Sequence, residues 1–286
     1  DAKGRLIGVD GTQGDLMDSR STDGFAKLGY DFAGARRLQL TVNRFDLQGN
    51  GDYTAVPGDM ASNLPTTSVR GKQPGDAPRN RVLTSSLDYR DPALAGGELR
   101  AQLYHQKNRE LFGGGRFATF QDPAYGPNVF DQSQNVSTKD GARLSWARRG
   151  LLDGKLTVLA GADGYRDRTF QELTHTGRHW VPDSTYTGWA PFLQAEYWPL
   201  ESLSLSGGLR HEHGTLDVPT FQTLAAYNGV TVQGGSTRFS KTLPNLGAVW
   251  YLTGRLNLFA SYAEGYTLPD VGRVLRAINK PGQDVA

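Results

Sequence analysis

The stretch Arg-Leu-Gln-Leu-Thr-Val-Asn at residues 37–43 alternates strictly between polar and apolar side chains. Successive side chains of a β-strand point to opposite faces, so this alternation predicts a strand with one polar and one apolar face. The pattern recurs about ten times along the chain, for example at residues 97–104 and 256–262. Each such segment runs for about 9–13 residues, which is the length of a tilted strand that crosses a bilayer.

The connections between these segments alternate between short and long. Short ones are expected at residues 32–36, 91–96, 150–154, 199–202 and 253–254, and long ones at residues 50–78, 109–135, 171–186 and 215–236. Loops above about 12–15 residues are uncommon in compact soluble domains. One end with tight turns and one with long loops is the layout of an outer-membrane barrel, whose turns are periplasmic and whose loops are extracellular. We therefore predict an all-β, antiparallel transmembrane β-barrel portion, in one domain over residues 1–286.

Composition limits the other classes of protein. The chain has 36 Gly, 14 Pro, 12 Phe, 12 Tyr and 5 Trp, a profile that favours strands and turns over helices. It has no Cys, which excludes disulfides, thiolate catalysis and zinc–sulfur sites. No run of about 18 apolar residues occurs, so a transmembrane helix is not expected. A net charge of +2 does not indicate a nucleic-acid-binding protein.

Several stretches near the C-terminal end resemble a known family. Residues 256–270 read Leu-Asn-Leu-Phe-Ala-Ser-Tyr-Ala-Glu-Gly-Tyr-Thr-Leu-Pro-Asp and resemble the late-barrel signature of TonB-dependent siderophore receptors. The Val-Gly-Arg-Val-Leu-Arg stretch at 271–276 fits the same family, as do residues 190–197, 205–212 and 241–247. Any one of these motifs is a moderate signal, whereas their occurrence in the family's order is a strong one.

The resemblance implies a 22-stranded barrel that is filled by an N-terminal plug domain. About ten of those strands are expected here, with no plug or TonB-contacting segment before residue 1 and no terminal aromatic strand at residues 284–286. We therefore expect a partial barrel domain, in contact with the lipid of a Gram-negative outer membrane. The resemblance also implies active import of a ferric siderophore, energised by the TonB–ExbB–ExbD complex through the plug, without enzymatic chemistry and without a cofactor.

Other functions fit the same architecture. A passive porin-like channel has the same alternation, and TonB-dependent receptors for heme, cobalamin or carbohydrate resemble siderophore receptors. The four long loops carry a small excess of acidic residues and so do not indicate an anionic ligand. An outer-membrane hydrolase is the enzymatic alternative, but neither a nucleophile elbow nor a metalloprotease motif is present.

The candidate substrate-binding residues are aromatic, His and Arg side chains. The rings supply the flat apolar faces, and the polar groups the donors, that a bulky chelate needs. They are Phe117, Tyr125, His179, Trp180 and Tyr186 in two of the long loops, and Arg143 and Arg210 on the polar face of the strands. Ordinary solvated loop residues remain the alternative for the first set, and salt-bridge ladders within the lumen for the two arginines.

Two further groups of residues have structural interpretations. His211, Glu212 and His213 could suggest a metal site, but alternation places Glu212 on the face opposite both histidines, and no metal site is expected. The aromatic residues near strand ends are interpreted as girdles at the membrane interface; they are Trp189, Tyr197, Trp198, Trp250 and Tyr251.

Overall fold

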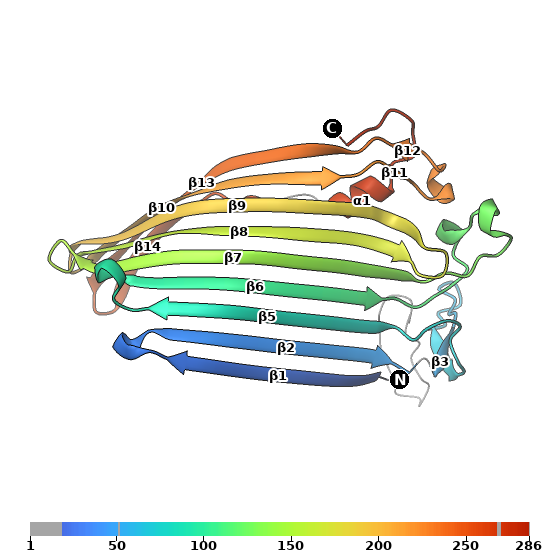
Figure 1. Cartoon of the computed structure of the whole chain (residues 1–286), viewed down its shortest axis with the longest axis horizontal. Helices are drawn as coiled ribbons and strands as arrows, with labels where there is room; N and C mark the ends of the chain where they lie inside the picture. The colour runs from blue at the N-terminus through green and yellow to red at the C-terminus, as the bar shows by residue number, and fades with distance from the viewer. Residues whose placement is uncertain (1–18, 51, 268–269, 286) are drawn as a thin grey trace.

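The computed structural model describes residues 19–50, 52–267 and 270–285, and ten of its strands form a single antiparallel sheet (Figure 1). In sheet order they are β1 (Ser19–Asp31), β2 (Arg37–Gly49), β5 (Arg79–Asp91), β6 (Glu98–Leu111), β7 (Ser133–Leu151), β8 (Leu156–Leu173), β9 (Arg178–Leu200), β10 (Leu203–Val218), β13 (Gly235–Thr253) and β14 (Leu256–Ala263). Each strand pairs with its neighbours in the sequence, as expected of a meander. The all-β, antiparallel prediction is confirmed.

The remaining elements belong to the long connections. They are the hairpin of β3 (Tyr53–Val56) and β4 (Thr67–Arg70), the short pair β11 (Phe221–Gln222) and β12 (Thr231–Val232), and helix α1 (Val271–Arg276). No helix in the described part of the chain is long and apolar enough to span a membrane. Of the late-barrel signature, Leu268 and Pro269 lie outside the described residues.

The sheet has tight turns at one end and long connections at the other. Figure 1 shows the turns after β1, β5, β7, β9 and β13 at one end of the strands, and the loops with α1 at the other. The turn after β1 is closed by Gly34, whose φ of 76° is a left-handed conformation that glycine adopts without strain. All five predicted short connections are confirmed.

One predicted loop is a pair of strands instead. Residues 171–186 were expected to form a long connection, but β8 continues to Leu173 and β9 begins at Arg178. The strands reach 23 residues in β9, well beyond the predicted length. Apolar alternation marks only the part of a strand that has an apolar outer face, whereas backbone pairing continues beyond that part.

The two faces of the sheet differ as the alternation predicts. The outer face, defined by Leu103, Leu144 and Leu193, presents exposed apolar side chains. The inner face is polar and concave, because Arg143 of β7 and Asn245 of β13 line the same hollow although several strands separate them. At the loop end, α1 packs on this inner face, where Leu275 joins a buried apolar cluster with residues of β10.

The aromatic residues assigned to girdles are divided between the two faces of the sheet. Strand alternation places Trp189, Tyr197 and Trp250 on the outer face, and Trp198 and Tyr251 on the inner face. Trp189, Tyr197, Trp250 and Tyr251 are exposed. The Trp198 and Tyr251 rings stack, with centroids 5.9 Å apart. Exposure of large rings is what an interfacial position requires, and the girdle assignment stays a prediction.

Candidate functional site

Three aromatic rings at the loop end form a continuous strip, which we call the aromatic strip. Phe117 and Phe120 meet edge to face with ring centroids 5.3 Å apart, and Phe120 meets Trp180 of β9 in the same way at 5.4 Å. Phe120 is buried together with Leu173 and Leu224, whereas Phe117 is 39% exposed. A buried ring therefore anchors an exposed one, and the strip presents a fixed apolar surface.

Cations lie against rings on both sides of the strip. The guanidinium carbon of Arg276 in α1 is 4.6 Å from the centre of the Trp180 ring, and that of Arg178 is 4.8 Å from the centre of the Tyr125 ring. The Tyr125 side chain is itself 51% exposed. This end of the sheet therefore combines flat apolar faces with positive charge, a combination that suits a bulky chelate.

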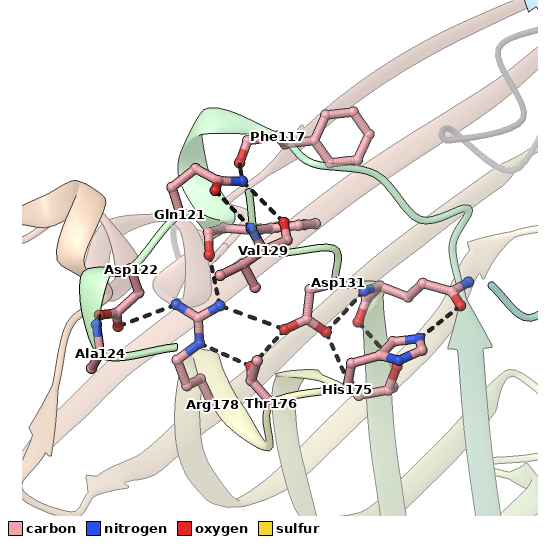
Figure 2. A network of polar contacts seen from close by, with 12 residues as sticks. Phe117, Gln121, Asp122, Ala124, Val129, Asp131, His175, Thr176 and Arg178 are labelled. Carbon is pink, nitrogen blue, oxygen red and sulfur yellow. Dashed lines mark hydrogen bonds and ion pairs between the residues drawn. The ribbon is translucent and has the colours of Figure 1, made fainter. Parts of the chain in front are cut away.

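A buried carboxylate organises the loop beneath the strip (Figure 2). Asp131 is fully buried, with 0% of its surface exposed, and its Oδ1 accepts hydrogen bonds from the backbone N–H groups of Gln132 and His175, both at 2.9 Å. Its Oδ2 accepts one from Thr176 Oγ1 at 2.5 Å and lies 3.5 Å from Arg178 Nη2. These contacts replace the water that a buried carboxylate loses, so the charge is tolerated in the interior.

Arg178 connects this carboxylate to the aromatic strip (Figure 2). Its side chain is only 9% exposed, and its Nη2 donates a 2.7 Å hydrogen bond to the backbone carbonyl of Phe120. Its Nε donates to Thr176 Oγ1 at 2.9 Å, and its Nη1 donates to the Asp122 carboxylate at 3.3 Å. The guanidinium therefore holds the backbone that carries the central ring of the strip.

Gln132 links three separate segments of the loop end. Its Oε1 accepts from the backbone N–H of Asp76 at 2.7 Å, while its Nε2 donates to the backbone carbonyls of Asp76 and Phe112 at 2.8 and 3.0 Å. His175 Nε2 lies 3.2 Å from the same Oε1. Gly75 packs against this amide with a φ of 82°, and a Cβ there would lie 2.4 Å from Oε1. The first long loop, the 112–132 loop and the turn between β8 and β9 thus share one buried amide.

The first long loop is also ordered within itself. The Asp59 carboxylate accepts from the Ser62 hydroxyl and, at 3.0 Å, from the backbone N–H of Ala61. These hydrogen bonds to the ionised form, the one from Ser62 foremost, hold the pKa of Asp59 below its usual range.

The structure separates His179 from the other aromatic candidates. The His179 ring stacks on Phe170, with centroids 5.3 Å apart, and its Nδ1 lies 3.4 Å from the Asp183 carboxylate. Phe170 belongs to the outer face of β8. Phe117 and Trp180 are brought together through Phe120 instead, so His179 and the aromatic strip lie on different sides of the sheet.

Tyr186 lies deeper, on the inner face and against the apolar cluster beneath α1. It packs on a cluster that includes Leu216 and Leu275, and its ring centroid is 5.5 Å from that of Tyr165. A Cβ at Gly214 would lie 2.0 Å from the Tyr186 hydroxyl oxygen, so glycine is required beside it. Tyr186 fills space in the mouth of the sheet, and a role in binding stays a prediction.

The two candidate arginines line a hollow of about 610 Å³ on the inner face. Arg210 Nη1 lies 2.8 Å from the Asp163 carboxylate, and its Nε lies 2.5 Å from that of Glu212. Arg143 forms no ion pair with a described residue; its guanidinium carbon lies 5.2 Å from the centre of the Tyr104 ring. Arg210 therefore takes part in the salt-bridge ladder that is its alternative interpretation, whereas Arg143 lies opposite Asp163 on the neighbouring strand without an ion pair among the described residues.

Within the parts of the chain that the structure describes, no group of three or more His, Cys, Asp or Glu side chains could hold a metal ion. His211 bonds instead to Thr242 Oγ1 at 2.9 Å and Ser240 Oγ at 3.2 Å. Glu212 is held by Arg210 on the inner face, away from the neighbouring histidines, as the alternation predicts.

Sequence reasoning missed the residues that hold the site together. Asp131, Gln132, Thr176 and Arg178 are ordinary polar residues in or beside loops, and their partners lie far away in the chain, up to 58 residues for Arg178 and Phe120. No periodicity marks such contacts. Covariation between residues 131 and 178 across homologues is the signal that could have identified the pair.

Comparison with protein-family models identifies the family. The model described as "TonB dependent receptor-like, beta-barrel" matches residues 11–282. Among solved structures, the copper transporter OprC superposes with a TM-score of 0.62 at 14% identity, covering 88% of this chain and 37% of that one. The FrpB iron transporter of Neisseria meningitidis gives a TM-score of 0.61 at 15% identity, covering 92% and 40%. At these identities, the superpositions show a shared fold.

Two curated relatives are similar over nearly the whole chain. The rhizobactin receptor of Rhizobium meliloti (strain 1021) is 24% identical over 304 residues, which cover 94% of this chain and 40% of the relative. The ferric aerobactin receptor of Klebsiella pneumoniae is 26% identical over 305 residues, which cover 96% and 41%. The chain thus spans about two fifths of the length of these relatives. Since the family model matches almost all of it, the chain belongs to the TonB-dependent receptor-like β-barrel family.

Proposed function

We propose that the full-length protein is a receptor in a Gram-negative outer membrane and that it imports a ferric siderophore. The observation that carries this proposal is that both relatives, similar over at least 94% of this chain, are receptors for siderophores. In this proposal the TonB–ExbB–ExbD complex supplies the energy through a plug domain inside the barrel, and the receptor performs no chemistry on its ligand.

The two faces of the sheet support the placement in a membrane. Leu103, Leu144 and Leu193 are all more than half exposed on the outer face, where water would make contiguous apolar surface unfavourable. Lipid removes that penalty, while the polar inner face suits a hydrated or plugged lumen. The long loops then face the outside of the cell, and the tight turns face the periplasm.

Capture of the chelate is assigned to the loop end. Phe117 and Tyr125 are exposed there, and buried contacts fix both the strip and the loop that carries it. Because the surface is preorganised, little conformational entropy is lost when a ligand binds. Trp180 lies in the same strip and serves as an intrinsic fluorescent reporter.

Growth under iron limitation, with single siderophores supplied, tests the proposal. A strain in which the gene is deleted is expected to lose growth on one ferric siderophore, and the intact gene should restore it. The deletion strain could instead grow normally on every iron chelate but lose uptake of copper, heme, cobalamin or an oligosaccharide. That result would falsify the siderophore assignment, although the protein would still be a transporter. Uptake that persists without TonB would indicate a porin-like channel.

Binding by purified full-length variants tests the site. Phe117→Ala and Trp180→Leu are each expected to weaken chelate binding by about tenfold or more, the usual effect of removing an aromatic anchor. His179→Ala is the matched control, because that ring stacks on Phe170 on the other side of the sheet. Binding is measured by fluorescence quenching, or by calorimetry for Trp180→Leu. Equal losses for His179→Ala and Phe117→Ala would place the ligand elsewhere.

A further inference from the structure

Residues 270–285, which we call the strap, lie at the loop end of β9 and β10 and include helix α1 (Figure 1). The helix packs closely on β9, since a Cβ at Gly272 would lie 3.1 Å from a methyl carbon of Val181. Leu275 is the buried residue of the helix and joins the apolar cluster that contains Leu216 of β10. A single short helix with one buried side chain is a weak attachment compared with the paired strands beneath it.

Beyond the helix, the strap is held to the 220–236 loop. The backbone N–H of Val285 donates to the Gln233 carbonyl at 3.2 Å, and Asn228 Nδ2 donates to the Asn279 carbonyl at 3.0 Å. These contacts belong to the far part of the strap, so they can persist when α1 moves away from β9.

The contact of Arg276 with Trp180 fastens the end of the helix to the aromatic strip. The Arg276 guanidinium lies over the Trp180 ring, with its carbon 4.6 Å from the ring centre, and Phe120 meets the same ring edge to face at 5.4 Å. Carbon atoms in contact are about 3.5–4.0 Å apart, so a flat ligand and the guanidinium cannot share this face of the indole. A chelate that stacks there must displace Arg276, and with it the end of α1.

Little else holds Arg276 in this position. The guanidinium forms no ion pair with any residue that the structure describes. The indole Nε1 of Trp180 is buried and has no hydrogen-bond partner within the described chain. A buried donor without an acceptor destabilises the conformation that buries it. The attached strap therefore combines a weak contact with an unsatisfied donor, and both favour its release.

Release of the strap uncovers more of the inner face. Tyr186 packs on the cluster that contains Leu275, and its ring centroid is 5.5 Å from that of Tyr165. The hollow of about 610 Å³ is lined by Phe192, about 20 Å further along β9 toward the turn end. Aromatic rings thus follow one another along β9 from the aromatic strip to the hollow, and the strap covers the middle of this series.

We propose that the strap is an autoinhibitory element, which a ferric chelate releases by displacing Arg276 from the Trp180 ring. The chelate first meets the exposed Phe117 and then competes with Arg276 for the indole face. Once Arg276 is displaced, α1 leaves β9, and Tyr186 becomes the next contact on the inner face. This inference rests on the proposed function, because it takes the aromatic strip as the binding surface of the transported chelate.

The direction of one change in affinity tests the proposal. Arg276→Gln removes the competing cation, so the full-length variant is expected to bind the ferric siderophore identified by the growth test about fivefold more tightly, the factor that a cation–π contact contributes. Arg273→Gln is the matched control, because it makes the same charge change on an exposed side chain of the same helix, and its affinity should stay unchanged. Calorimetry measures both. Weaker or unchanged binding by Arg276→Gln would overturn the proposal, and weaker binding would make Arg276 a direct ligand contact.

A disulfide that fixes the strap to β9 gives a second test. The chain has no Cys. Because a methyl carbon is bonded to Cβ at about 1.5 Å, the Cβ atoms of residues 181 and 272 lie within about 4.6 Å, which a disulfide can bridge. In a full-length protein without other cysteines, oxidation of the variant Val181→Cys, Gly272→Cys should lower the rate of siderophore uptake at least about tenfold, and reduction should restore it.

The matched control places a disulfide in the first long loop. Thr54→Cys with Val69→Cys joins direct cross-strand partners of β3 and β4 and leaves the strap free, so uptake should be the same in both redox states. Equal uptake by the oxidised and reduced forms of the strap variant contradicts the proposal. If that variant does not fold, the affinity of Arg276→Gln still decides.

Hydrogen exchange without ligand separates the strap from the siderophore assignment. The amides of Ala277 and Ile278 donate within the helix region at 3.2 and 3.3 Å, and Arg276→Gln should raise their exchange about fivefold, whereas Arg273→Gln should not. If the protein binds no ferric siderophore, the proposed function fails, while faster exchange still identifies Arg276 as the residue that fastens the strap. If a siderophore binds but leaves exchange at these amides unchanged, the autoinhibitory strap is refuted and the proposed function stands.

Discussion

The buried Asp131–Arg178 pair provides the most specific prediction, through the substitution Asp131→Asn. Asparagine keeps the size of the side chain and one acceptor oxygen but removes the negative charge. Arg178, only 9% exposed, then retains just the Asp122 carboxylate, at 3.3 Å. Breaking a buried ion pair costs about 3–5 kcal/mol. Because Asp122 still compensates part of the Arg178 charge, we expect a loss of stability at the lower end of this range, about 3 kcal/mol. Local opening of the loop end should therefore become about 100-fold more frequent.

Amide hydrogen exchange on the full-length protein measures this opening. The informative amides are those of Thr174, which donates to the Gln132 carbonyl at 2.8 Å, and Gly115, which donates to the Asp131 carbonyl at 3.0 Å. Peptides from the part of β7 near the turn end should keep their protection, since the effect is local.

The matched control is Asp140→Asn, in a pair at the surface. The Asp140 side chain is 65% exposed and pairs with His105, so its loss should cost no more than about 1 kcal/mol. If Asp131→Asn leaves exchange at Thr174 and Gly115 unchanged, or changes it no more than the control does, the buried pair does not hold the loop and the reasoning is refuted.

Three further substitutions test the faces and the packing. Leu144→Arg on the outer face should destabilise the full-length barrel in vesicles by about 2–4 kcal/mol near the midplane, and Ser145→Arg much less; equal costs in urea unfolding would contradict the assigned faces. Gly214→Ala introduces a Cβ 2.0 Å from the Tyr186 hydroxyl oxygen and should lower the free energy of unfolding by about 1–3 kcal/mol. The second substitution Tyr186→Phe removes that hydroxyl and should recover part of the loss, measured as Tm. Gln132→Leu removes the hydrogen bonds to the partly buried backbone groups of Asp76 and Phe112, at about 0.5–1.5 kcal/mol each, and should make the first long loop cleave faster under limited proteolysis. Unchanged cleavage would argue against the shared amide.

Alternation allowed prediction of the strands only where one face of the sheet is apolar and the other polar. The segment at 37–43 is alternating and lies within β2 as expected, since its apolar residues share the outer face with Leu87 of β5. Residues 171–173 and 178–186 continue β8 and β9 without that pattern, because both faces are hydrated or covered by loops. Backbone pairing there is decided by neighbouring strands, which no local signal encodes.

The candidate site divided in a similar way. Phe117 and Trp180 could be selected because large rings in loop segments are conspicuous, and the structure brings them together through Phe120. The polar residues beneath them could not be selected from the sequence. An aspartate that becomes buried has the same local sequence features as an exposed loop aspartate, and only the folded structure supplies its partners. Asp131 reaches His175 across 44 residues, a relation that only the fold supplies.

The length of β9 has a consequence for how a charged solute reaches the protein. Its 23 residues extend about 75 Å, or about 58 Å along the normal at a tilt of about 40°, so the strand projects on the order of 30 Å past a 25 Å apolar band. At physiological ionic strength, electrostatic potentials decay over about 8 Å. In the proposed orientation, ions in solution therefore screen the charge of the membrane surface before its potential reaches the loop end of β9. A charged chelate that approaches this end then experiences the charges of the loops and not those of the membrane surface.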